Sequence, residues 1–204
     1  MIKAIVLDIG GVLVRTEDPL GRREIEAEFN LPPHTVEAFV FDSQEAAAST
    51  LGEVNANEVW QSIGEKLNLT KGQLDKFIES FWRGDVFDHN LHQFFQSLRE
   101  NYTTAFLTNA WQGARDDLAK RFGIIEGETV DYLLISSELG VAKPDPKIYK
   151  KLRQTVNLPY NEILFVDDFS ENISAADQLG IQTIHFQKGL DPISEIQSML
   201  GKAP

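Results

Sequence analysis

The chain has 204 residues, of which 42% are hydrophobic and 25% are charged, and this composition is that of a globular protein long enough to bury a sizeable core. Its net charge of -12, with 19 Lys and Arg residues scattered along the sequence, argues against binding to nucleic acid or to an anionic membrane. There is no cysteine, so disulfides, thiol catalysis and cysteine-ligated metal sites are excluded.

The first residues predict a buried strand. Residues 3 to 7 form a short apolar run, rich in β-branched side chains, which ends at Asp8 and is followed by Gly10 and Gly11. With one early lysine and only four or five apolar residues, the start of the chain is neither a signal peptide nor a membrane span. We therefore expect a cytoplasmic protein.

The region from about Glu17 to Phe87 is helical in pattern and contains no good strand. Apolar residues at helical spacing predict helices over residues 20 to 29 and 55 to 67, and a third helix after the capping box formed by Thr70 and Gln73. We expect this region, residues 17–87, to be a helical cap domain inserted into a core domain made of residues 1–16 and 88–204.

The remainder of the chain alternates between strands and helices. Strands are predicted over residues 104–107, 132–135, 163–166 and 181–186, and amphipathic helices lie between them and after the last one. This alternation indicates βαβ units. The predicted fold is therefore α/β, with a Rossmann-like parallel sheet of about five strands and helices on both of its faces.

Polar residues lie where these strands end, or in the adjacent loops. They are Asp8, Thr108, Asn109, Lys143, Asp167 and Asp168. In a parallel sheet these positions share one edge, which is where such folds bind ligands. A carboxylate nucleophile, a hydroxyl donor, an ammonium and metal-binding acids are the groups that phosphoryl transfer through an aspartyl-phosphate needs. An isolated Asp-Asp pair would more often cap the following helix. Here the pair is one of four sets of polar residues at strand ends or in adjacent loops, and their order along the chain favours an active site. The sets are Asp8, Thr108 with Asn109, Lys143, and Asp167 with Asp168.

The same segments resemble the motifs of the haloacid dehalogenase-like (HAD) superfamily, whose members are mostly magnesium-dependent phosphatases. The matching segments are residues 8–12, 107–109, 143–146 and 166–172. The helical insertion, with residues 51–54 in it, is similar to the small α-helical cap of the subgroup that contains bacterial α-D-glucose-1-phosphate phosphatase. The resemblance implies a magnesium-dependent phosphatase that acts on a small phosphorylated metabolite, with a sugar phosphate as the favoured class.

The resemblance also implies a role for each matching residue. Asp8 would attack phosphorus. Mg²⁺ would be held by Asp8, the main-chain carbonyl of Gly10, Asp168 and, through water, Asp167. Thr108 and the backbone of Asn109 would donate to the phosphate, and Lys143 would neutralise its charge. The remaining candidates, close to the substrate or supporting the metal-binding loop, are Gly11, Arg15, Trp111 and Asn172.

Gly10 departs from the usual pattern of the superfamily. Most members have a second aspartate at this position, which acts as the general acid for the leaving alcohol, and glycine supplies no proton. The leaving group could be good enough to need little help, as the anomeric oxygen of a sugar 1-phosphate is; another acid, Glu17 or Asp18, could serve; or hydrolysis could be slow or lost. We favour the first explanation, because the glucose-1-phosphatase subgroup resembles this chain in having glycine there.

Two other functions stay open at this point. A 2-haloacid dehalogenase also uses an aspartate nucleophile, but it needs no magnesium, and the pair Asp167 and Asp168 favours a metal. A regulatory or binding module could keep the fold without turnover, and Gly10 permits this. A mutase is disfavoured, since it would need an acid at Gly10. Neither the exact substrate nor the oligomeric state can be read from the sequence.

Overall fold

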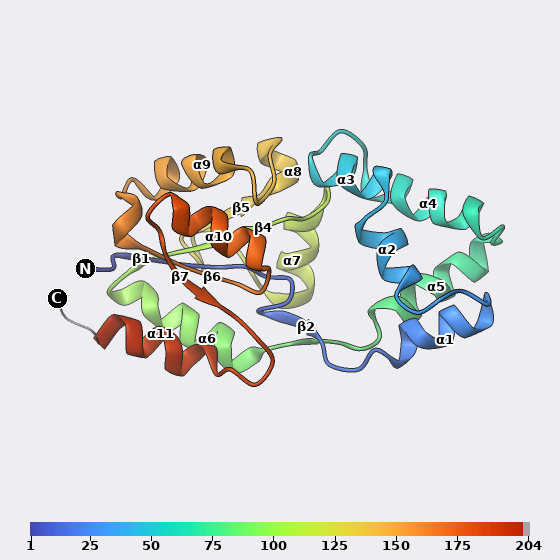
Figure 1. Cartoon of the computed structure of the whole chain (residues 1–204), viewed down its shortest axis with the longest axis horizontal. Coiled ribbons are helices and arrows are strands. Elements are labelled where there is room, and N and C mark those ends of the chain that lie inside the picture. Colours follow the sequence, from blue (N-terminus) through green and yellow to red (C-terminus); the bar gives the residue numbers. More distant parts are fainter. Residues whose placement is uncertain (202–204) are drawn as a thin grey trace.

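A computed structural model of the chain describes residues 1–201 (Figure 1). Its largest element is a five-stranded parallel sheet with the strand order β5-β4-β1-β6-β7. The strands are β1 (Ala4–Leu7), β4 (Thr103–Thr108), β5 (Tyr132–Ile135), β6 (Ile163–Asp167) and β7 (Gln182–His185). The α/β class and the parallel sheet expected from the sequence are confirmed.

Helices cover both faces of this sheet, and the alternation of side chains along β1 shows why. Ile5 and Leu7 point to one hydrophobic core, and Ala4 and Val6 point to another. The first core is closed by α6 (His89–Ser97), α7 (Ala114–Phe122) and α11 (Pro192–Gly201). The second is closed by α8 (Ser136–Leu139), α9 (Pro146–Val156) and α10 (Ser170–Gln178). A strand that is buried on both faces reads as a continuous apolar run, as residues 4–7 do.

A separate group of helices lies to one side of the sheet, away from the amino terminus (Figure 1). Its members are α1 (Leu20–Glu28), α2 (Thr35–Phe41), α3 (Gln44–Thr50), α4 (Ala56–Lys66) and α5 (Lys71–Trp82). They share a hydrophobic cluster of their own, which includes Val40, Ile63 and Phe81. Two 3-10 turns, Leu98–Glu100 and Tyr160–Glu162, complete the helical elements of the described chain.

A short antiparallel ribbon connects the two parts. It consists of β2 (Val14–Thr16) and β3 (Asp85–Phe87). The expectation of no strand up to Phe87 was therefore wrong at β3. Three residues are too few to show an alternating pattern, and the ribbon forms because the chain enters and leaves the helical group side by side. Arg22 of α1 reinforces it, with its Nη2 atom 3.0 Å from Asp85 Oδ1.

Candidate active site

The carboxyl ends of two neighbouring strands bring the predicted acids together. Asp8 directly follows β1, while Asp167 is the last residue of β6 and Asp168 follows it. One carboxylate oxygen of each residue lies within 4.8 Å of the others. Thr108, the last residue of β4, is buried at the same edge. Residues 159 positions apart in sequence meet here because β1 pairs with β6 in parallel.

Lys143 places one ammonium group between two of these acids. Its Nζ atom is 2.9 Å from Asp8 Oδ1 and 2.6 Å from Asp167 Oδ2. The Lys143 side chain is only 1% exposed, so water screens these ion pairs little. Removing Lys143 would leave two buried carboxylates without their cationic partner, which is strongly destabilising, whereas removing one of the acids leaves the ammonium paired with the other.

Three carboxylates and one ammonium leave this site with an excess of negative charge, and the pKa values of the acids reflect it. Burial, opposed by Lys143 and aided by the neighbouring Asp167 carboxylate, raises the pKa of Asp8 to about 7. Burial and the Asp167 carboxylate likewise raise the pKa of Asp168 to about 6. Both shifts report that further negative charge is unfavourable here unless a cation is added.

Asp167 is held by donors from several directions. Its Oδ1 accepts hydrogen bonds from the backbone N–H of Phe169 at 2.8 Å and from Asn172 Nδ2 at 3.0 Å, and Oδ2 accepts from Lys143. The hydroxyl of Tyr149 donates to the Asn172 carbonyl at 2.8 Å, which fixes that asparagine in turn. Asp167 is therefore an orienting group whose oxygens are already occupied.

Asp168 is different, because one of its oxygens is buried without a partner. Within residues 1–201, Asp168 Oδ1 has no hydrogen bond. The carboxylate lies against the backbone of Gly11, where a Cβ atom would come 2.0 Å from Asp168 Oδ2 and where φ is +75°. A side chain at this position would have to displace the Asp168 carboxylate and adopt a left-handed backbone angle, so the site favours glycine.

The donor set fits a hard divalent cation. It offers carboxylate oxygens, an excess of negative charge and one buried acceptor that lacks a donor. Asp8 and Asp168 are the residues that could ligate such an ion directly, since Asp167 is already engaged by Lys143, Phe169 and Asn172.

The loop after β4 is fixed by its side-chain hydrogen bonds. Asn109 bonds through its amide group to the main chain of Lys143. Ser136, which was not among the predicted site residues, accepts a hydrogen bond from the Ala110 N–H at 3.0 Å. A signal for it existed: Ser136 directly follows the apolar strand β5, just as Asp8 follows β1.

Arg15 and Trp111, the two candidates for substrate contact, both have protein partners. Arg15 donates to Glu17 Oε1, to the Val12 carbonyl and to Asp88 Oδ2, and so ties together the two segments that connect the core to the helical group. The half-buried Trp111 packs edge-to-face on Trp60 of α4, with 5.5 Å between ring centroids. It therefore joins the loop after β4 to the helical group.

The two acids considered as substitutes for a general acid are also engaged. Glu17 pairs with Arg15 at 3.1 Å, and Asp18 Oδ1 accepts a hydrogen bond from the backbone N–H of Leu20 at 2.9 Å. Within residues 1–201 neither carboxylate forms a hydrogen bond with Asp8 or Lys143. Gly10 itself is exposed, and a Cβ atom built on it meets no heavy atom within 4 Å.

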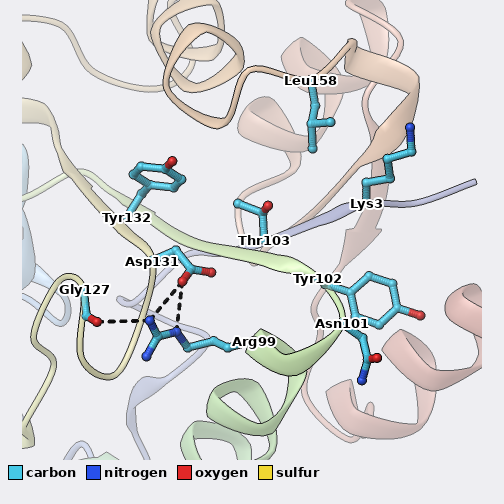
Figure 2. Close-up of a pocket in the computed structure, with 9 residues that line it drawn as sticks. All are labelled: Lys3, Arg99, Asn101, Tyr102, Thr103, Gly127, Asp131, Tyr132 and Leu158. Atoms are coloured by element: carbon cyan, nitrogen blue, oxygen red, sulfur yellow. Dashed lines mark hydrogen bonds and ion pairs between the residues drawn. The ribbon is translucent and has the colours of Figure 1, made fainter.

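A cavity of about 780 Å³ lies at the opposite edge of the sheet, around the residues where β4 and β5 begin (Figure 2). The guanidinium group of Arg99, which lines this cavity, donates hydrogen bonds to Asp131 and to the carbonyl of Gly127 (Figure 2). Asp131 also accepts a hydrogen bond from the Thr104 N–H. The charged groups of Arg99 and Asp131 are therefore already engaged with protein partners. The candidate site residues at the carboxyl edge do not line this cavity.

Comparison with known proteins agrees with this fold. The protein-family model for haloacid dehalogenase-like hydrolases matches residues 2–180. The chain therefore belongs to the haloacid dehalogenase-like hydrolase family, and it is a hydrolase by class.

Three individual proteins illustrate the relationship. D-ribitol-5-phosphate phosphatase of Bacteroides thetaiotaomicron is 26% identical over 98% of this chain and 99% of its own length. Bifunctional epoxide hydrolase 2 of Rattus norvegicus is 31% identical over 50% of this chain, a match that spans only 19% of that relative. Among solved structures, a HAD family enzyme from Bacteroides thetaiotaomicron, in complex with magnesium and inorganic phosphate, superposes with a TM-score of 0.78 at 22% identity, covering 99% of this chain and 100% of the other.

No helix within residues 1–201 has the length and apolar character needed to cross a membrane.

Proposed function

We propose that the chain is a magnesium-dependent phosphatase that hydrolyses the phosphate monoester of a small metabolite, with a sugar phosphate as the favoured class. The observation that carries this proposal is the meeting of Asp8, Asp167 and Asp168 around one point, with Lys143 in contact with the first two. The phosphatase activity of the Bacteroides relative and the magnesium and phosphate bound to the similar structure support it.

In the proposed reaction, Asp8 is the nucleophile. Its Oδ1 accepts hydrogen bonds from the Ile9 N–H at 2.7 Å and from Lys143, and these donors orient the carboxylate so that Oδ2 can approach phosphorus. A bond forms between Asp8 and phosphorus while the ester P–O bond breaks, and the alkoxide leaves and takes a proton from solvent, since Gly10 supplies none. Water then attacks phosphorus and gives up a proton to solvent, which breaks the P–O bond to Asp8, releases inorganic phosphate and restores the carboxylate.

Three other groups assist in this proposal. Thr108 and the Asn109 N–H donate to phosphate oxygens, and the Lys143 ammonium offsets the negative charge that enters with the substrate. Asp8 and Asp168, with the Gly10 carbonyl and a water on Asp167, would hold Mg²⁺, which when bound supplies the positive charge that phosphoryl transfer requires. Asn172 keeps Asp167 in place.

We also propose that the chain has two domains with different roles. Residues 1–16 and 88–204, of which 202–204 lie outside the described residues, form the catalytic core domain, and residues 17–87 form the cap domain that selects the leaving group. The cap meets the core close to the site in two places, at the Trp60–Trp111 contact and where Gly52 lies against the Ser137 carbonyl.

A panel of phosphorylated metabolites tests the proposal. With Mg²⁺ present, we expect turnover of p-nitrophenyl phosphate and acetyl phosphate, and faster turnover of anomeric sugar phosphates than of primary-alcohol phosphates, because Gly10 supplies no proton to a poor leaving group. Chelation of the metal should abolish the activity. Equal rates on both ester types would refute the sugar 1-phosphate preference.

Two other results, one from this panel and one from an assay of 2-haloacids, would replace the proposal. If the purified protein hydrolyses none of the phosphorylated compounds, the result would favour a binding or regulatory module. Halide release from 2-haloacids without magnesium would instead identify a dehalogenase.

A further inference from the structure

The side chain of Asn109 forms a reciprocal pair of hydrogen bonds with the main chain of Lys143. Its Nδ2 donates to the Lys143 carbonyl at 2.9 Å, and its Oδ1 accepts from the Lys143 N–H at 2.9 Å. The two residues are 34 positions apart, and nothing else in the described chain bonds to both backbone groups of Lys143. The amide therefore fastens the end of β4 to the loop that carries the active-site ammonium.

The position of this loop matters because the Lys143 side chain has no freedom to adjust. It is 1% exposed and ends between Asp8 Oδ1 and Asp167 Oδ2, at 2.9 and 2.6 Å. On its other side the loop is fixed to α9, where Asp145 donates its N–H to the Ala142 carbonyl at 3.0 Å and caps the helix through the N–H of Lys147. Asn109 supplies the anchor on the side of the catalytic groups.

We propose that the Asn109 side chain is a positioning residue, which acts on the reaction by holding the main chain of Lys143 so that its ammonium contacts Asp8 and Asp167 together. This inference rests on the proposed phosphatase function. It assigns to the side chain a role distinct from that of the Asn109 backbone N–H, which remains in place when the side chain is changed.

A double-mutant cycle on turnover of p-nitrophenyl phosphate with Mg²⁺ tests this link. Lys143→Met removes the ammonium, and we expect kcat to fall by about 10²- to 10³-fold. Asn109→Ala leaves Lys143 chemically intact but loosens its loop, and a misplacement of about 1 Å can cost up to ~10²-fold. If Asn109 acts through Lys143, the double variant will be no slower than Lys143→Met alone, because there is then no ammonium left to position.

Thr104→Val is the matched control. Thr104 lies at the opposite end of the same strand, and its hydroxyl donates to Asp131 Oδ2 at 3.0 Å, so the variant also loses a bond between β4 and a loop. We expect it to lower the melting temperature without lowering kcat. If Thr104→Val reduced kcat as much as Asn109→Ala, general loosening of β4 would explain the loss and the positioning role would be refuted, as it would be by independent losses that multiply in the double variant.

A crystal structure of Asn109→Ala tests the same inference without any assay. We expect Lys143 Nζ to move beyond about 3.5 Å from Asp8 or Asp167. If it stays bonded to both, the inference is wrong even where the phosphatase assay succeeds. If the wild-type protein turns over no phosphate, the proposed function fails, and the crystal structure alone then decides whether Asn109 positions Lys143.

Discussion

Asp8→Asn will reduce phosphatase turnover to background, a loss on the order of 10⁴-fold or more. The amide has the shape of the carboxylate and can still accept from the Ile9 N–H and from Lys143, but it cannot form an aspartyl-phosphate. The measurement is kcat for acetyl phosphate or p-nitrophenyl phosphate in saturating Mg²⁺. Retained activity would show that another residue is the nucleophile.

The stability of this variant serves as its control, and its sign follows from the pKa of Asp8. Because burial raises this pKa to about 7, the fold favours the protonated acid. The penalty for ionising Asp8 is absent below its unfolded pKa, grows between that value and about 7, and is complete above pH 7. Without metal at pH 8, Asp8→Asn should therefore melt at a higher temperature than wild type, whereas a lower melting temperature would mean that the lost activity reflects unfolding.

Gly10→Asp will raise turnover of primary-alcohol phosphates by about 10²-fold, because it restores a general acid beside the leaving oxygen. The site has room for the side chain, since Gly10 is exposed and its Cβ position is free of heavy atoms within 4 Å. p-Nitrophenyl phosphate, whose leaving group needs no proton, should gain little. The readout is the ratio of kcat values for the two substrates.

Gly10→Asn is the matched control for this gain. It adds a side chain of the same size that has no titratable proton. The ratio of kcat for primary-alcohol phosphates to kcat for p-nitrophenyl phosphate should therefore stay at the wild-type value. An equal gain in the Asp and Asn variants would mean that packing or polarity, not proton transfer, limits the wild-type enzyme.

The main features of the fold and the site could be predicted because both depend on local patterns. Strands buried on both faces appear as apolar runs, and the runs ending at Asp8 and Asp167 placed their acids at one edge of a parallel sheet. The capping box at Thr70 likewise marks the observed start of α5.

Features that depend on distant contacts were not predictable. Helices α2 and α3 each bury only two residues and follow the pair Pro32 and Pro33, so their periodicity is weak. The amide of Asn109 could be recognised as a partner of Lys143 only after the fold had joined segments 34 residues apart. Arg15 was a candidate for substrate contact, and nothing in the sequence indicated the hydrogen bond to Asp88 that engages its guanidinium in the structure.

The most direct test is a crystal structure of the protein grown with Mg²⁺ and beryllium fluoride, which mimics a phosphoryl group on a carboxylate. We predict that beryllium bonds to a carboxylate oxygen of Asp8 and that Mg²⁺ lies about 2.1 Å from oxygens of Asp8 and Asp168. Beryllium fluoride bound to another residue, or Mg²⁺ bound away from Asp168, would contradict the proposal that acids from the two ends of this chain share one metal-dependent phosphoryl-transfer site.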